Sequence, residues 1–228
     1  PHSKGCCPVI NLGQEMDHAE RILHKANGAE IPVLKTVKRL QTDSGEKLIE
    51  TFMDLTERKK MEEQLYRLSI SDPLTNAYNR RYFTQKLEEE IERAKRTGSK
   101  FSLVMLDIDR FKSINDRFGH NAGDLVLKSI AELIKNRIRK IDTLARWGGE
   151  EFVLLLPDTP VYKAAVLAEE LRESISKMDV LGVDRVTASF GVAGYCPGDT
   201  VDTLVNKADN MMYEAKAAGR NCVRYMNE

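Results

Sequence analysis

Two aspartates end an apolar stretch of the sequence in a pattern that could serve metal chemistry. Residues 101–109 are strand-like, and Asp107 and Asp109 stand where the apolar run stops. Alternate residues of a strand point to the same side, so these two carboxylates should share one face. Buried carboxylates need a compensating positive charge, and in phosphoryl-transfer sites Mg²⁺ held by carboxylates and substrate phosphates supplies it. The alternative is a pair of aspartates that cap the turn after the strand.

Two glycines and two glutamates stand at the tip of an expected hairpin. Residues 144–147 and 152–156 flank the segment Gly148-Gly149-Glu150-Glu151. The glycines permit a tight turn and a close approach of backbone to a ligand, and the glutamates add two more carboxylates. Taken alone, this segment also fits an ordinary polar hairpin.

These candidate residues belong to a part of the chain that predicts a mixed fold. From residue 71 onward, helical and strand-like patterns alternate. Helices are expected over residues 81–95, 124–139, 161–177 and 201–218, and strands over residues 101–109, 144–147, 152–156 and 185–193. We expect this half of the chain to carry the catalytic site.

Residues 1–57 predict a small β-rich unit, with strands over residues 31–40 and 47–55 separated by the turn signal Thr42-Asp43-Ser44-Gly45. An amphipathic helix is expected next, because apolar Met61, Leu65 and Leu68 recur at steps of four and three. This helix either lies on its own domain or forms a coiled coil with a second chain. We favour the coiled coil, for a reason that follows from the chemistry below.

Length and composition limit the classes of protein to consider. The chain has 228 residues, enough for one full domain and a smaller unit. Its 35 basic and 35 acidic residues cancel, and no apolar run approaches the roughly 18 residues that cross a bilayer, so we expect no nucleic-acid partner and no membrane contact. We expect a cytoplasmic protein with four reduced cysteines. Because the first residue is proline, we expect a piece of a longer protein, and a membrane segment upstream remains compatible with it.

Seven short motifs occur in one order along this half of the chain. They are Asp72-Pro73-Leu74-Thr75, Asn79-Arg80-Arg81, Asp107-Ile108-Asp109, Phe111-Lys112, Asn115-Asp116, Phe118-Gly119-His120 with Gly123-Asp124, and Gly148 to Phe152. Together they resemble the GGDEF diguanylate cyclases, with GGEEF as the variant, over roughly residues 71–227. The resemblance implies an enzyme that joins two GTP molecules into cyclic di-GMP and releases two pyrophosphates. It also implies an α+β fold, related to the nucleotide-cyclase and polymerase palm, whose central, mostly antiparallel sheet is flanked by helices.

The resemblance assigns roles to the acidic residues. Asp107 and Glu150 become side-chain ligands of Mg²⁺ or Mn²⁺, and Ile108 becomes a ligand through its carbonyl. Glu150 also helps to deprotonate the attacking 3′-hydroxyl, and Glu151 assists. Gly148 and Gly149 let the backbone approach the substrate.

The resemblance also assigns the residues that bind GTP. The β- and γ-phosphates are held by Arg110, Phe111 and Lys112 through backbone N–H groups, and by Lys216 and Arg220, which we expect on one helix face. The alternative is that residues 110–112 form a plain strand-to-helix turn and that Lys216 and Arg220 lie at a solvated helix end. Asn115 and Asp124 read guanine, because a carboxylate accepts two hydrogen bonds from guanine and finds no such donors on adenine. The alternative for Asp124 is a helix N-cap.

Regulation is implied by an Arg-x-x-Asp pattern, Arg139 to Asp142, which ends shortly before the glycines. As a bare pattern it carries little information, but at this offset it resembles the family's inhibitory site for cyclic di-GMP. We expect turnover to slow as product accumulates.

The reaction implies a homodimer, because each catalytic domain holds one GTP and the new bonds join two GTP molecules. A coiled coil over the linker would align the two half-sites, which is why we favour it. Residues 1–57 resemble the C-terminal half of a PAS sensor, followed by a helical linker over 58–71 and the cyclase domain over 72–228. Cys6, Cys7 and His24 are either sensory ligands or surface and packing residues.

Two other readings stay open. A catalytically silent GGDEF-type receptor would bind GTP or cyclic di-GMP and signal through its linker helix. Against silence stands an intact set of residues: Asp107, Asn115, Gly149, Glu150 and Lys216. An enzyme with relaxed base choice would make an adenine-containing dinucleotide, and Asp124 argues against that.

Overall fold

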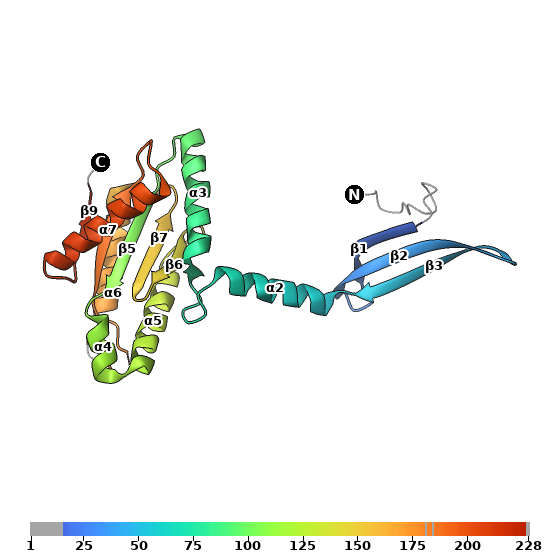
Figure 1. Ribbon diagram of the computed structural model, residues 1–228, viewed down its shortest axis with the longest axis horizontal. Helices are drawn as coiled ribbons and strands as arrows, with labels where there is room; N and C mark the ends of the chain where they lie inside the picture. Colours follow the sequence, from blue (N-terminus) through green and yellow to red (C-terminus); the bar gives the residue numbers. More distant parts are fainter. Residues whose placement is uncertain (1–15, 181, 184, 227–228) are drawn as a thin grey trace. The chain divides into compact units, whose positions relative to one another are not determined.

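The computed structural model describes residues 16–180, 182–183 and 185–226 (Figure 1). The chain divides after Arg67 into two compact units, a small N-terminal one and a large C-terminal one, which we describe separately. No described helix is long and apolar enough to cross a membrane. The expected positions Cys6 and Cys7 lie outside the described residues, and the two described cysteines, Cys196 and Cys222, are free, as predicted.

The N-terminal unit is a three-stranded antiparallel sheet. Its strands are β1 (Met16–His24), β2 (Glu30–Thr42) and β3 (Gly45–Asp54), in that spatial order. Thr42 pairs with Gly45, which confirms the predicted hairpin around Asp43 and Ser44. The sequence analysis did not predict β1. His24, at its end, is exposed and lies 3.5 Å from Glu30 between Nδ1 and Oε1, so it faces a surface carboxylate.

Helix α2 (Thr56–Ile70) follows this sheet and runs across the boundary between the units. It begins where the Asp54 carboxylate accepts a hydrogen bond of 2.7 Å from the Thr56 N–H, an Asx-type turn that satisfies one of the first N–H groups of the helix. None of its residues is buried, and Met61, Leu65 and Leu68 are 59%, 67% and 71% exposed. The predicted helix is therefore confirmed, and Met61, Leu65 and Leu68 expose most of their surface in this one chain.

The C-terminal unit is built on a six-stranded sheet in the order β4-β6-β7-β5-β8-β9. The strands are β4 (Tyr78–Asn79), β5 (Ser102–Ile108), β6 (Thr143–Gly148), β7 (Glu151–Leu156), β8 (Ala188–Gly194) and β9 (Val223–Tyr225). The four inner strands pair antiparallel, and the short edge strands β4 and β9 pair parallel with their neighbours. This confirms the expected α+β fold with a mostly antiparallel sheet. The sequence analysis missed β4 and β9, which are too short to show a period.

Helices cover both faces of this sheet (Figure 1). They are α3 (Arg80–Thr97), α4 (Phe111–Phe118), α5 (His120–Lys135), α6 (Val161–Ser176) and α7 (Val201–Ala217). Leu103 and Met105 of β5 belong to one core cluster with α3 and α7, whereas Leu106 and Ile108 belong to another with α4, α5 and α6. The alternation of β5 side chains between two cores explains why every residue of this strand is buried.

The prediction of one helix starting at Asp124 is wrong. The chain forms α4 first, and Gly119 between α4 and α5 has φ 83°, a conformation that favours glycine and ends the helical hydrogen bonding. Helix α5 then begins at His120. Asp124 therefore lies inside α5 rather than at its start, which removes the alternative that it is an N-cap.

Candidate active site at the end of β5

Strand pairing brings the two acidic segments together. Asp107 of β5 pairs with Glu151 of β7, and the Ile108 N–H donates a hydrogen bond of 3.4 Å to the Glu150 carbonyl. The glycine corner turns here because the register shifts between Arg146 and Gly148, and Gly149 has φ 26°. The strand end and the hairpin tip therefore lie next to each other.

Negative charge exceeds positive charge in this site. Burial raises the pKa of Asp107 and outweighs Lys216, whose Nζ lies 2.8 Å from the Asp107 carboxylate. Burial and the nearby Asp107 charge also raise the pKa of Glu150 and of Glu151. Three carboxylates thus share one close ammonium group, so a bound cation would be strongly stabilised.

The donor set fits one hard divalent cation. Asp107 and Glu150 offer carboxylates, and Ile108 between them offers its carbonyl; Mg²⁺ characteristically takes one or two carboxylates and fills other positions with substrate phosphates and water. Within the described residues, no three His, Cys, Asp or Glu side chains form a complete metal cage by themselves. The site therefore suits a cation that arrives with a phosphorylated substrate.

Asp109 differs from Asp107 although it is two residues away. Its carboxylate accepts hydrogen bonds from Thr187 Oγ1 at 2.7 Å, Ser189 Oγ at 2.6 Å and the Asn221 N–H at 3.0 Å. With these donors Asp109 is satisfied inside the protein and fixes the C-terminal segment to the end of β5. Of these two aspartates, Asp107 is the one whose carboxylate remains available to a cation.

The N-terminus of α4 presents free backbone donors. Arg110 has φ 56° and precedes the helix without a side-chain cap, so the first N–H groups of α4, those of Phe111 and Lys112, point out of the helix end uncapped. A left-handed residue followed by helical ones forms the concave arrangement that binds anions. This geometry fits the phosphate role predicted for residues 110–112.

Lys216 and Arg220 do not share a helix face, so this part of the prediction is wrong. Helix α7 ends at Ala217, and Gly219 and Arg220 have φ 111° and 67°. The Arg220 N–H donates to the Ala215 carbonyl at 3.1 Å and closes the helix end. Lys216 thus reaches the site from α7, and Arg220 from the turn after it.

Asn115 and Asp124 stand on adjacent helices, α4 and α5. Both are half-buried. Gly123 explains how Asn115 fits, because a Cβ atom at Gly123 would lie 2.0 Å from Asn115 Oδ1. The sequence analysis named Gly123 only within a motif; the signal for a structural role was a glycine inside a helix, where it costs about 1 kcal/mol relative to alanine.

Arg146 supports the glycine corner, and sequence reasoning missed it. Its guanidinium donates to the Gly149 carbonyl at 2.6 and 3.0 Å and lies 3.2 Å from the Asp72 carboxylate. Asp72 also accepts from the Thr75 N–H and hydroxyl at 2.9 and 2.7 Å. Burial would raise the pKa of Asp72, but the bonds from Thr75 and Arg146 lower it. The motif around Asp72 thus holds the hairpin tip through Arg146.

The Arg-x-x-Asp pair is formed within the chain. The Asp142 carboxylate accepts from the Arg139 N–H and guanidinium, both at 2.8 Å. Arg139 also donates to Thr159 Oγ1 at 2.8 Å and to the Pro157 carbonyl at 3.2 Å. The side chain of Asp142 is 1% exposed and that of Arg139 is 54% exposed. The arginine therefore presents its outer face to solvent while the aspartate fixes its direction.

Comparison with known proteins gives a consistent result. The family model for "Diguanylate cyclase, GGDEF domain" matches residues 69–222. The chain is 43% identical over 170 residues to diguanylate cyclase DgcM of Escherichia coli K12, a match covering 75% of the chain and 42% of DgcM. It is 41% identical over 162 residues to the response regulator PleD of Caulobacter vibrioides NA1000, covering 68% and 36%. The chain thus spans less than half the length of these relatives.

Solved structures agree on the fold. The coiled coil and GGDEF domain of DgcB from Caulobacter crescentus, in complex with c-di-GMP, has a TM-score of 0.72 at 30% identity, covering 75% of this chain and 93% of DgcB's. The active GGEEF domain of a diguanylate cyclase from Vibrio cholerae has a TM-score of 0.63 at 34% identity, covering 66% and 97%. With the matched motifs and the geometry at the end of β5, these findings show that the chain belongs to the GGDEF-domain diguanylate cyclase family.

Proposed function

We propose that this chain is a diguanylate cyclase, which condenses two GTP into cyclic di-GMP and releases two pyrophosphates. The observation that carries the proposal is the junction of Asp107 with Glu150 and Glu151, which gathers carboxylates beside the uncapped start of α4. Such a site combines cation binding with phosphate binding, as nucleotidyl transfer requires.

In this proposal Asp107, Glu150 and the Ile108 carbonyl would hold Mg²⁺ or Mn²⁺, and the ion would supply positive charge to the triphosphate and the departing pyrophosphate. Glu150 accepts the proton of the attacking 3′-hydroxyl, a role that its raised pKa favours. Glu151 assists through its charge. Lys216, Arg220 and the backbone of residues 110–112 orient the β- and γ-phosphates, and the absence of side chains at Gly148 and Gly149 leaves room for the substrate.

Guanine specificity is assigned to Asn115 and Asp124. The Asp124 carboxylate accepts two hydrogen bonds from the ring N–H and exocyclic amine of guanine. Adenine offers no such pair, so with ATP a partly buried acceptor would lose its partners at a cost of about 1–3 kcal/mol. This difference favours GTP over ATP.

Two chains must meet for the reaction, and we propose that α2 joins them. Its exposed Met61, Leu65 and Leu68 form the apolar stripe that a coiled coil buries. The similar DgcB structure contains a coiled coil with its GGDEF domain, which supports this assignment. We assign residues 58–71 to the linker, residues 72–228 to the cyclase domain and residues 1–57 to a partial PAS-like sensor unit.

Product inhibition is assigned to Arg139 and Asp142. The exposed guanidinium of Arg139, directed by a buried carboxylate, suits the guanine and phosphate of cyclic di-GMP. Arg139→Ala should turn over GTP without the slowing that product causes in the unmodified chain.

The decisive experiment incubates the chain with Mg²⁺ and GTP, ATP or both, and measures dinucleotide identity and pyrophosphate. We expect cyclic di-GMP from GTP alone, with two pyrophosphates per product, and loss of both in Glu150→Gln. A dimer that binds GTP without turnover would instead favour a silent receptor. An adenine-containing product would indicate relaxed base choice.

A further inference from the structure

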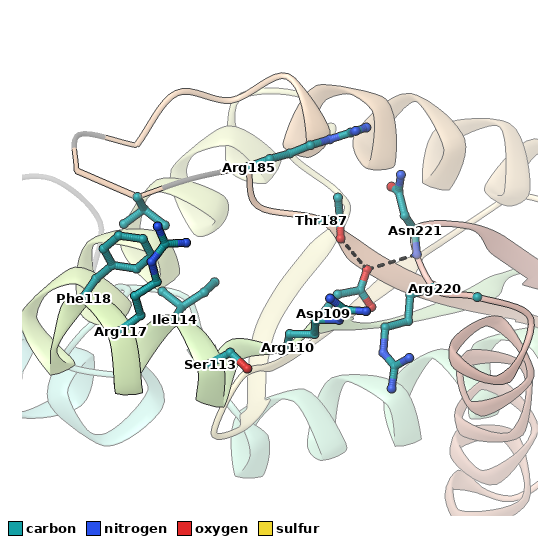
Figure 2. Close-up of a pocket in the computed structure, with 12 residues that line it drawn as sticks. Asp109, Arg110, Ser113, Ile114, Arg117, Phe118, Arg185, Thr187, Arg220 and Asn221 are labelled. Carbon is teal, nitrogen blue, oxygen red and sulfur yellow. Dashed lines mark hydrogen bonds between the residues drawn. The ribbon is translucent and has the colours of Figure 1, made fainter.

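A cavity rich in arginine lies beside α4 (Figure 2). It has a volume of about 330 Å³. We call it the arginine pocket; its lining residues come from the end of β5, from α4, from the segment before β8 and from the turn after α7. The residues that carry its chemistry are Asp109, Arg110, Arg117, Arg185, Thr187 and Arg220.

The arginine pocket is strongly positive. Four guanidiniums line it against one carboxylate, Asp109. The dashed bonds in Figure 2 show that Asp109 is already engaged by Thr187 and by the Asn221 backbone. Within the described part of the chain, Arg110, Arg185 and Arg220 form no ion pair. Four guanidiniums lining one cavity around a single, already engaged carboxylate favour an anion.

The pocket lies on a different side of α4 from Asn115, which is proposed to bind guanine. Ser113 and Arg117 line the pocket, whereas Asn115 contacts Gly123 on α5. Residues two apart on a helix differ by about 200° around its axis, so these side chains leave α4 on opposite sides. The pocket is therefore not a second base site. Its volume is at the small end for ligand sites and suits a small anion rather than a nucleotide.

The pocket shares its rim with the proposed phosphate site. Arg110 and Arg220 line it and are also the residues assigned to the β- and γ-phosphates. Arg185 and Arg117 line the same cavity as these two arginines. In the proposed function the terminal phosphates of GTP would therefore lie at the rim of the pocket.

We propose that the arginine pocket receives the leaving pyrophosphate, and that Arg185 is a pyrophosphate-binding residue; this rests on the proposed function. When a 3′-oxygen bonds to the α-phosphorus of the second GTP, the bond between that phosphorus and the oxygen that joins it to the β-phosphorus breaks. The electron pair leaves on pyrophosphate, and the hydroxyl proton passes to Glu150. The extra negative charge makes pyrophosphate a better ligand for free guanidiniums than the uncleaved ester.

The test measures binding of inorganic pyrophosphate with Mg²⁺ by calorimetry in the absence of nucleotide. We expect Arg185→Gln to weaken binding about tenfold, the effect of losing one charge-assisted hydrogen bond, and Arg185→Lys to restore part of it. The matched control is Arg137→Gln, an exposed arginine outside the pocket, which should bind pyrophosphate normally. Inorganic phosphate should bind more weakly than pyrophosphate.

Three results would overturn the proposal. They are no pyrophosphate binding by the unmodified chain, equal affinities in Arg185→Gln and Arg137→Gln, and a KM for GTP that rises in Arg185→Gln as much as the pyrophosphate Kd. The last would assign Arg185 to the bound triphosphate. Cyclic di-GMP is measured on the same preparations, so the two proposals fail separately. Arg185-dependent binding without product would overturn the cyclase function and leave the pocket as a pyrophosphate site without a role in turnover. Product formation with Arg185-independent binding would overturn the pocket proposal alone.

Discussion

Asp107 and Asp109 lie two residues apart at the end of β5, and their surroundings give them different chemistry. Asp109 accepts three hydrogen bonds from protein donors and is satisfied. Asp107 lies 2.8 Å from the ammonium of Lys216, with Arg220 as a further positive neighbour and acidic Glu150 and Glu151 nearby. The carboxylate left with unmet charge is the one suited to hold a cation, so the immediate neighbours of each side chain decide its role.

Gly123→Ala should weaken GTP binding without unfolding the protein. The new Cβ atom would lie 2.0 Å from Asn115 Oδ1 and must displace that side chain from its place. Alanine is favoured over glycine in a helix by about 1 kcal/mol, so the loss of packing is partly offset. We expect the KM for GTP to rise about tenfold, measured by steady-state kinetics.

The control for this prediction is Asn121→Ala, an exposed change on the same helix, which should leave the KM unchanged. An unaltered KM in Gly123→Ala would mean that the position of the Asn115 side chain does not affect GTP binding.

Asp199 fixes the start of α7 and should make stability depend on pH. Its carboxylate accepts from Lys207 Nζ at 2.7 and 2.8 Å and from the Cys196 N–H at 2.9 Å. Burial would raise the pKa of Asp199, but these bonds lower it below its ordinary value of 3.8. The folded state thus binds this proton less tightly than the unfolded state. The stabilisation is complete above pH 3.8 and is lost as pH falls through the folded-state pKa.

We therefore expect Asp199→Asn to lower the free energy of unfolding by about 1–3 kcal/mol at pH 7, measured in urea. The difference from the unmodified protein should shrink as the pH falls below 3.8. Asp202→Asn, at an exposed position in the first turn of α7, should cost at most about 1 kcal/mol. A difference that stays constant down to pH 3 would contradict this account.

At the scale of elements, helix α7 packs on strand β8, and this packing positions Lys216 in the site. Gly191 of β8 permits this contact, because a Cβ atom there would lie 2.1 Å from the Ala208 carbonyl oxygen and 2.2 Å from the Met212 nitrogen. Both are backbone atoms and cannot rotate away. The position of Lys216 over Asp107 therefore depends on the missing side chain of Gly191 on β8, the strand next to β5.

Gly191→Ala should force α7 away from the sheet. We expect a loss of about 1–3 kcal/mol in the free energy of unfolding, measured by denaturant titration. Turnover should fall as well, since Lys216 moves with the helix. Unchanged stability would show that α7 and β8 tolerate a methyl group between them.

At the scale of the whole molecule, activity should depend on association of two chains. Leu65→Glu would place a charge on the apolar stripe of α2, where Leu65 is 67% exposed in one chain. We expect a weaker dimer by analytical ultracentrifugation and a turnover per chain that recovers as protein concentration rises.

Gln64→Glu is the matched control for this prediction. It adds the same charge to the neighbouring position of α2, outside the stripe of Met61, Leu65 and Leu68, and should leave the dimer intact. Equal dimerisation of both variants would place the contact between chains elsewhere.

Much of this protein was readable from its sequence. The hairpin of β6 and β7, strand β5, helix α2 and the approximate helices α3, α6 and α7 follow from local hydrophobic periodicity, and the motifs indicated which residues gather at the end of β5. These features are local, so the chain specifies them within short segments.

Tertiary structure decided the rest, because it depends on contacts between distant residues. The Asp109 carboxylate meets the backbone of Asn221, 112 positions later, which separates its role from that of Asp107. The link from Asp72 to Arg146, the departure of Arg220 from α7 and the placing of Arg185 and Arg110 around one cavity likewise arise only when segments pack. Strand register and packing fix these contacts, and no periodicity within one segment encodes them.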